Sequence, residues 1–250
     1  MAELVYPPVI AAALTMFRVL GMRPRVDGGH HVPRTGGAVL ASNHVSYLDF
    51  IFCGLAARDS GRLVRFMAKQ EVFADRVAGP LMRGMRHIPV DRAAGAGSYD
   101  AAVAALRGGE IVGVFPEATI SRSFTVKPLK TGAVRMARAA GVPILPVAIW
   151  GSQRLWTKGR PRQLTKRGVP ITIMVGEAIP VADTDDVGRA TDELRRHLSA
   201  LVDRAQRGYP AVPSGLDDGW WLPAHMGGSA PTAEEAAALD QGDRPAPSTP

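Results

Sequence analysis

Between residues 23 and 209, short apolar runs alternate with longer segments whose apolar positions recur at helical spacing. The short runs have the length of strands, and the longer segments have the length of helices. This alternation is typical of an α/β domain, in which helices pack on a central sheet. We therefore predict strands at residues 39–41, 64–68, 87–90, 111–115, 144–149 and 171–175, and helices at residues 47–57, 71–82, 98–106, 131–140 and 184–206.

Residues 1–22 form an apolar segment ahead of this domain. The uninterrupted apolar part, residues 9–17, is shorter than the roughly 20 residues that a membrane-spanning helix requires. The segment also has no basic residue before Arg18, whereas a secretory signal begins with one. We predict an amphipathic helix that lies at a membrane interface, and the alternative is a first helix packed on the core. One helical stripe would carry Ile10, Leu14, Phe17 and Gly21.

After Tyr209 the chain becomes rich in Pro, Gly, Ala, Ser and Asp. Because such a composition does not support a large apolar core, we predict that residues 210–250 are largely disordered. Trp220 and Trp221 are an exception, since a tryptophan pair docks on a folded domain or sits at a lipid interface. Docking is the interpretation that we favour. The folded domain then spans residues 23–209.

The 250-residue chain has a formal net charge of +7, which is unevenly distributed. After Pro213, six acidic residues stand against one arginine, so residues 1–213 carry +12. A positive excess favours anionic partners such as phospholipid head groups or acyl-CoA, although a scattered solvated basic surface would give the same charge. The sequence has no zinc-finger spacing, RNP-like aromatic run or dense basic helix, so we expect no nucleic-acid partner.

Cys53 is the only cysteine in the sequence. A single cysteine excludes an internal disulfide and a metal site built from several cysteines, and we predict no bound metal. We expect Cys53 to pack as a small apolar side chain, which is compatible with a reducing cytoplasm.

A histidine and an aspartate follow the first predicted strand. Asn43 and His44 lie where the apolar run of residues 39–41 ends, and Ser46 and Asp49 have the spacing of a helix capping box. On an unbroken helix, His44 and Asp49 would point about 140° apart, so a turn between them is required. Asp49 could then accept a hydrogen bond from one imidazole nitrogen and leave the other free as a base. The alternative is that Asp49 only caps the helix and His44 is an ordinary loop residue.

Charged residues also follow other predicted strands, as expected where strand ends line a site in an α/β sheet. Arg92 comes after the strand at residues 87–90, and its planar guanidinium suits bidentate binding of phosphate. Glu117 ends the next strand, where it could bind hydroxyl groups or hold an arginine in place. Lys130 precedes a helix whose N-terminal amides favour anions. Each could instead be an ordinary loop residue, and we interpret His87 as structural.

These blocks occur in the order and spacing of the four motifs of the 1-acylglycerol-3-phosphate acyltransferase family. The chain resembles this family over roughly residues 25–180. One histidine and aspartate at this spacing would be a weak signal, but four ordered blocks are specific. The blocks are Asn43-His44 with Asp49, Lys69 and Glu71 through Val90-Asp91-Arg92, Phe115-Pro116-Glu117, and residues 142–147.

The resemblance implies a mixed central β-sheet flanked by helices, and it implies a chemistry. In this family a fatty acyl group passes from acyl-CoA, or from acyl carrier protein, to the free hydroxyl of a lysophospholipid, with no cofactor. His44 would be the general base and Asp49 its orienting acid. The acceptor would be bound by Asn43, Arg92, Glu117, Arg122 and Lys130. The protein would make phosphatidic acid in phospholipid biosynthesis, as a peripheral or monotopic protein on the cytoplasmic face of the cell membrane.

The third motif departs from the family's pattern. The family continues after the glutamate with glycine, threonine and arginine, whereas alanine, threonine and Ile120 follow Glu117 here. Arg122 could replace the missing arginine, or the acceptor is another lysolipid, a glycolipid or a hydroxylated metabolite. Two further alternatives are a catalytically silent membrane-binding protein with the same fold and a thioester hydrolase that releases thiol without an acceptor.

Overall fold

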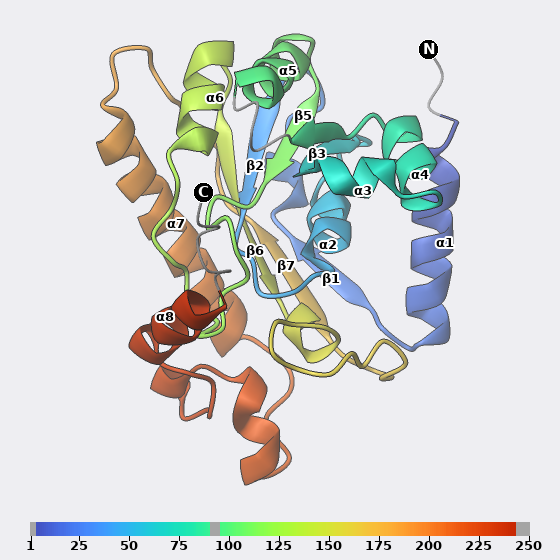
Figure 1. Cartoon of the computed structure of the whole chain (residues 1–250), viewed down its shortest axis with the longest axis vertical. Helices are drawn as coiled ribbons and strands as arrows, with labels where there is room; N and C mark the ends of the chain where they lie inside the picture. Colours follow the sequence, from blue (N-terminus) through green and yellow to red (C-terminus); the bar gives the residue numbers. More distant parts are fainter. Residues whose placement is uncertain (1–3, 91–95, 244–250) are drawn as a thin grey trace, which may run out of the picture.

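The computed structural model describes residues 4–90 and 96–243. Within these ranges, seven strands form one sheet in the order β1-β7-β6-β2-β5-β3-β4 (Figure 1). Neighbouring strands are parallel except for β6 and β7, so the sheet is mixed as expected. The strands are β1 (Pro24–Asp27), β2 (Ala38–Ser42), β3 (Val64–Lys69), β4 (Ile88–Val90), β5 (Ile111–Val114), β6 (Ile144–Trp150) and β7 (Ile171–Val175).

The six predicted strands are all present, and β1 is the strand that the sequence pattern did not predict. Its four residues include a proline and two charged side chains, and their burial does not alternate. β1 forms because it pairs in parallel with β7, with Val26 opposite Ile173. A strand defined by a distant partner leaves little signal in its own sequence.

Helices cover both faces of the sheet (Figure 1). One face carries α1 and α2, which pack on β2, β6 and β7. The other face carries α5, α6 and α7. The helices are α1 (Tyr6–Val19), α2 (Asp49–Ala56), α3 (Gln70–Ala74), α4 (Ala78–Gly84), α5 (Ala96–Arg107), α6 (Gly132–Ala140), α7 (Val187–Arg207) and α8 (Ala233–Gly242).

The single helix predicted at residues 71–82 is wrong, because the structure has two short helices there, α3 and α4. Asp75 ends α3 in an extended conformation. Its Oδ1 then accepts hydrogen bonds from the backbone N–H groups of Val77 and Ala78, at 2.8 Å each. These two bonds lower the pKa of Asp75 and begin α4 in a new direction.

The N-terminal segment forms helix α1, which packs on the core through part of its surface. The Phe17 ring stacks on Phe52 with 5.2 Å between centroids, and the Tyr6 hydroxyl donates to the Val64 carbonyl at 2.7 Å. Met16 and Val19 remain exposed. None of the helices in the described ranges is long and apolar enough to cross a bilayer. The position of α1 at a membrane interface stays a prediction.

The segment after α7 folds back on the domain, which corrects the expectation that residues 210–250 are largely disordered. Two 3-10 turns, at Leu216–Trp221 and Ala224–Met226, lead to α8. Trp221 is fully buried, with its ring 5.6 Å from that of Tyr209. Burial of this large aromatic side chain orders a segment that has few other apolar residues. Residues 244–250 lie outside the described part of the chain.

Candidate active site

His44 lies on the turn that connects β2 to α2, directly after the buried Asn43. The Asn43 Nδ2 donates to the Ile149 carbonyl at 3.0 Å, and its Oδ1 accepts from the Ile149 N–H at 2.7 Å. The side-chain amide is thus bonded on both sides to the neighbouring strand β6. In this structure Asn43 therefore positions the turn that carries His44, and its binding of substrate stays a prediction.

Asp49 is the first residue of α2, and its fully buried carboxylate holds this turn together. Its Oδ2 accepts from His44 Nδ1 at 3.0 Å and from the N–H groups of Val45 and Ser46 at 2.7 Å each. Its Oδ1 accepts from Ser152 Oγ at 2.6 Å. The turn that the sequence spacing required is present, and it brings His44 and Asp49 into direct contact.

The prediction that Ser46 caps a helix starting at residue 47 is wrong. α2 begins at Asp49, and Leu48 occupies the N-cap position without a side-chain hydrogen bond. The Ser46 hydroxyl donates to the Trp156 carbonyl at 2.6 Å and accepts from the Leu48 N–H at 3.1 Å. The chain curls around the Asp49 carboxylate before the helix begins, since this carboxylate binds backbone N–H groups of the turn.

The surroundings of His44 fix its tautomer. The Asp49 oxygens accept hydrogen bonds from several donors, so the His44 Nδ1 that faces them carries the proton. Nε2 is then the unprotonated nitrogen. The side chain is 20% exposed, and its ring stacks on Phe115 with 4.3 Å between centroids. His44 can therefore take a proton from a group that reaches Nε2, while Asp49 stabilises the imidazolium that forms.

Glu117 is buried after the end of β5 and holds the main chain of His44. Its Oε1 accepts from the His44 N–H at 2.9 Å, and its Oε2 accepts from the Lys127 N–H at 3.1 Å. Burial raises the pKa of Glu117 to about 8, against the lowering effect of these two bonds and of the Lys127 charge. Both carboxyl oxygens are thus engaged by the backbone, so Glu117 positions His44 in this structure, and its binding of an acceptor stays a prediction.

The residues after Glu117 explain the unusual third motif. Ala118 has a φ of 64°, in the left-handed region that glycine enters without strain. Ile120 is buried, so the position where the family carries an arginine points into the protein. The next residue, Ser121, donates its N–H to the His44 carbonyl at 2.7 Å. The loop therefore keeps its contact with His44 but presents no cation at residue 120.

Three cations gather beside this loop and meet two carboxylates of the tail. Asp240 lies 2.7 Å from the Nζ atoms of Lys127 and Lys158 and 3.3 Å from Arg122 Nε. Asp243 lies 3.0 Å from Lys158 Nζ and also pairs with Arg122. We call Arg122, Lys127 and Lys158 the basic cluster. Arg122, which we expected to bind substrate, is paired with the tail in this structure.

The remaining predicted residues are placed as follows. Arg92 lies outside the described residues. Lys130 is exposed just before α6, and its N–H donates to the Pro116 carbonyl at 2.8 Å. His87 is buried; its Nδ1 accepts from the Phe66 N–H at 3.1 Å, and burial together with the nearby Arg65 charge lowers its pKa to about 4. His87 is a neutral structural histidine, as we interpreted it.

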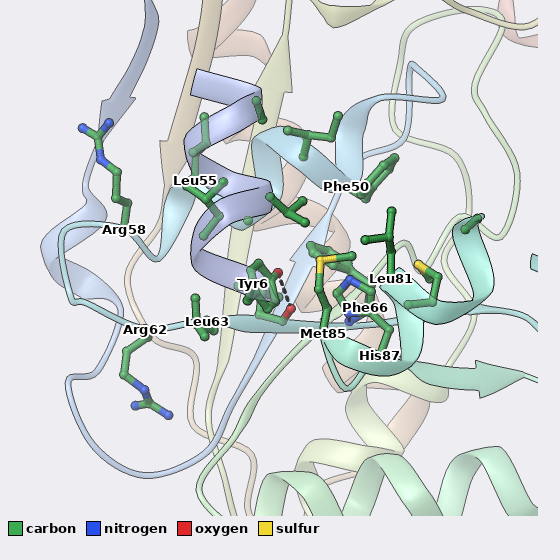
Figure 2. Close-up of a pocket in the computed structure, with 18 of the residues that line it drawn as sticks. Tyr6, Phe50, Leu55, Arg58, Arg62, Leu63, Phe66, Leu81, Met85 and His87 are labelled. Atoms are coloured by element: carbon green, nitrogen blue, oxygen red, sulfur yellow. Dashed lines mark hydrogen bonds between the residues drawn. The ribbon is translucent and has the colours of Figure 1, made fainter. Parts of the chain in front are cut away.

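An apolar cavity of about 480 Å³ lies between α1, α2 and α4 (Figure 2). Its lining includes Phe50, Phe66 and Leu81. Phe66 links the cavity to the site, because its ring stacks on Phe115 with 6.3 Å between centroids and Phe115 in turn stacks on His44. Cavities of this size and lining hold small apolar ligands or parts of larger ones.

Sequence patterns did not single out Ser152, Lys127 or Lys158. Ser152 follows β6, whose carboxyl end lies at the same edge of the sheet as that of the parallel strand β2. In the sequence, Gly151 directly follows the apolar run of β6, and its φ of 99° in the structure ends this strand. Because strand ends line sites in α/β sheets, the residue after this glycine could have been predicted to lie near His44. Lys127 and Lys158 lie in irregular loops, where the sequence pattern does not predict which side chains meet. Within the described ranges, no group of three or more His, Cys, Asp or Glu side chains could hold a metal ion.

The chain is similar to known acyltransferases over most of its length. The Acyltransferase family model matches residues 23–150. A 1-acyl-sn-glycerol-3-phosphate acyltransferase from Bacillus subtilis is 30% identical over 174 residues, which cover 69% of this chain and 82% of that protein. The enzyme of the same name from Limnanthes douglasii and the human alpha form are 30% and 31% identical. These two alignments span 77% and 71% of this chain but 66% and 63% of the relatives.

A solved structure has the same fold. The 1-acyl-sn-glycerophosphate acyltransferase PlsC from Thermotoga maritima aligns with a TM-score of 0.69 and covers 82% of this chain and 81% of that chain, at 21% identity. The family model matches half of the sequence, and the resemblance noted from the motifs is confirmed by the curated relatives. The chain belongs to the acyltransferase family.

Proposed function

We propose that the protein transfers a fatty acyl group from acyl-CoA, or from acyl carrier protein, to the free hydroxyl of 1-acylglycerol-3-phosphate and so makes phosphatidic acid. The observation that carries this proposal is the contact of His44 Nδ1 with the buried Asp49 carboxylate, which leaves Nε2 as a base. The stacked rings of Phe115 and Phe66 connect His44 to the apolar cavity. The names of the relatives support the choice of acceptor.

The transfer needs one base and no covalent intermediate on the protein. His44 Nε2 takes the proton of the acceptor hydroxyl as its oxygen attacks the thioester carbonyl carbon. The C–O bond of the new ester forms and the C–S bond breaks, and the imidazolium returns its proton to the departing thiolate. Asp49 stabilises the imidazolium between these two proton transfers, and Phe115 keeps the ring in place.

The apolar cavity would hold an acyl chain. Its lining by Phe50, Leu55, Leu81 and Met85 offers contacts for a hydrocarbon chain and few polar groups (Figure 2). The stacked rings of Phe66 and Phe115 lie between this cavity and His44, so a chain that passes along them would bring its carboxyl end toward the base. The two reacting groups would then meet at Nε2.

The same side of the molecule would face the membrane. Phe50 and Leu81 both line the cavity and are exposed, so the apolar lining continues onto the surface. Arg58 also lines the cavity and could pair with anionic head groups (Figure 2). A lipid substrate could enter from such a face without crossing water. Other exposed apolar side chains on the helices and turns near this side are Leu4, Met16, Val19 and Val77.

A second candidate acceptor follows from the third motif. The buried Ile120 stands where the family places an arginine, so the acceptor could be another lysolipid, a glycolipid or a hydroxylated metabolite. Arg122 is the cation that would serve a phosphate-bearing acceptor in its place. The two candidates differ in whether replacement of Arg122 reduces activity.

The test is a product analysis with purified protein, one labelled acyl-CoA and a mixture of lysolipids. We expect phosphatidic acid as the main product, and we expect none from His44→Ala. A preference for a lysolipid without a phosphomonoester would support the second candidate. Thiol release in the absence of any acceptor would identify a hydrolase, and a lack of thiol release with every donor and acceptor would contradict an enzymatic function.

A further inference from the structure

The basic cluster is tied to the His44 turn from several sides. The residue before Arg122 donates its N–H to the His44 carbonyl at 2.7 Å. The residue before Lys158 donates its hydroxyl to the Val45 carbonyl at 2.6 Å. The Lys127 N–H donates, at 3.1 Å, to the carboxyl group that holds the His44 N–H. The three cations therefore stand at fixed positions relative to the catalytic turn.

The cluster has the charge pattern of an anion site, and the tail fills it. The side chains of Arg122, Lys127 and Lys158 are each at least half buried. All three pair with Asp240, and Arg122 and Lys158 also pair with Asp243. Two carboxylates carry about the charge of one phosphate monoester at neutral pH. Burial alone would raise the pKa of Asp240, but hydrogen bonds from Lys127 and Lys158 lower it to about 2, so the pairs persist at neutral pH.

The helix that brings these carboxylates is lightly attached to the domain. Ala236 is the buried residue of α8, and Leu239 is 47% exposed. A capping box of Thr232 and Glu235 stabilises the helix itself without binding it to the domain. In Figure 1, α8 lies at the periphery of the molecule, beside the loop that follows β5. Ion pairs of partly exposed groups are weak individually and are screened by salt, so an anion can compete with them.

We propose that the basic cluster binds a phosphate group of a substrate and that α8 is a strap which closes this site, with Asp240 and Asp243 in the place of the phosphate. The proposal rests on the proposed function only for the source of that phosphate. Phosphate displaces the carboxylates, and α8 leaves the basic cluster next to the His44 turn. The missing arginine at residue 120 is thereby replaced by three cations from two loops.

Two substrates of an acyl transfer carry a suitable phosphate, the glycerol phosphate of the acceptor and the 3′-phosphate of CoA. The shared chemistry is a phosphate monoester. Two probes separate the sources: sn-glycerol 3-phosphate and CoA without an acyl group. The probe that opens the strap at the lower concentration identifies the substrate that binds there.

The test measures hydrogen exchange of the α8 amides in the full chain with and without each probe, together with the probe's dissociation constant. We compare the wild-type protein with Asp240→Asn/Asp243→Asn and, as a matched control on an exposed position of the same helix, with Glu234→Gln. A saturating probe should speed α8 exchange in the wild type and in the control. The double variant should exchange fast without a probe and should bind it at least about tenfold tighter, the gain expected if the strap closes the site about nine-tenths of the time.

The strap is ruled out if a saturating probe leaves α8 exchange unchanged or slows it, or if the double variant binds the probe no more tightly than the control. Failure of both probes to bind the double variant would rule out the phosphate site itself. These readouts do not require turnover, so a protein without acyltransferase activity would contradict the proposed function and leave this test intact.

Discussion

The Glu117 carboxyl group bonds the main chain of His44, with Oε1 2.9 Å from the His44 backbone nitrogen. Its other oxygen binds the Lys127 N–H at 3.1 Å, so one buried side chain ties the catalytic turn to the loop that carries the basic cluster. The His44 ring is held separately by Asp49. The position of the base therefore depends on one carboxyl group for its backbone and on another for its side chain.

The raised pKa of Glu117 predicts a pH-dependent stability. Burial raises this pKa from 4.5 to about 8, so between these values the folded protein keeps a proton that the unfolded chain releases. The contribution of Glu117 is complete below about pH 4.5 and is lost as the pH rises to about 8. We expect the free energy of unfolding to fall across this window with a slope approaching about 1.4 kcal/mol per pH unit.

Urea unfolding at several pH values measures this slope, and Glu117→Gln should remove it because glutamine does not titrate. The variant should also be less stable at low pH, since its amide NH₂ cannot accept from a backbone N–H. An equal slope in the wild type and the variant would assign the pH dependence to another group.

Replacement of Asn43 distinguishes a role in positioning the His44 turn from a role in binding substrate. Asn43→Ala leaves the Ile149 N–H and carbonyl without their side-chain partner in a buried setting. We expect a loss of roughly 1–3 kcal/mol in the free energy of unfolding for each orphaned group. Among molecules that remain folded, the KM for the acceptor should change little. A raised KM with unchanged stability would restore the substrate-binding role that the resemblance suggested.

The sequence predicted the main strands because their apolar runs are local. The spacing of His44 and Asp49 required a turn if the two were to meet, and the resemblance to the family favoured that contact over simple capping. It did not predict β1, which depends on pairing with β7. The roles of Asn43 and Glu117 were not predictable either, because their partners, Ile149 and Lys127, are brought to them only by the packing of the sheet and its loops. The resemblance indicated which residues matter, and the structure shows the contacts of those that lie in the described ranges.

The ordered structure of residues 210–243 was also not predictable from the sequence. The composition of this segment indicated disorder, but composition does not specify where each residue lies in the fold. One tryptophan, Trp221, is buried against Tyr209, and Asp240 of α8 and Asp243 just after it pair with cations of the domain. The excess of positive charge in residues 1–213 and of negative charge after them was visible in the sequence. Their contact was not, because it depends on where the chain turns back.

The apolar cavity predicts a change in chain-length preference. A Cβ atom added at Gly54 would lie 3.8 Å from Phe66 and 3.9 Å from the Tyr6 hydroxyl, which is ordinary contact. Gly54→Ala should therefore fold well, and Gly54→Leu should extend into the cavity that Gly54 lines. We expect Gly54→Leu to lower kcat/KM for long acyl chains by about tenfold or more and to spare short ones.

A competition assay with acyl-CoA donors of increasing length measures this preference, and Gly54→Ala is the matched control. The alanine variant should keep the wild-type profile. A uniform loss for all chain lengths in the leucine variant would show that the cavity does not hold the acyl chain.

Replacement of Asp49 by asparagine can separate the effect of its negative charge on His44 from its effect on the shape of the turn. In Asp49→Asn, the side-chain oxygen should stay toward Val45 N–H, Ser46 N–H and His44 Nδ1, because three donors converge there. The new NH₂ group then faces Ser152 Oγ, which can accept a hydrogen bond. The turn and the tautomer of His44 are preserved, but the negative charge that stabilises the imidazolium is lost.

We expect Asp49→Asn to reduce kcat by about a hundredfold to ten-thousandfold with little change in the KM for either substrate. His44→Ala sets the floor for this comparison. Ser152→Ala is the structural control: it removes one hydrogen bond to the buried carboxylate, which should cost about 1.5–3 kcal/mol of stability but leave the charge beside His44. If Asp49→Asn retained wild-type kcat while Ser152→Ala lost activity, the carboxylate would serve only to shape the turn, and His44 would need no charged partner to act as a base.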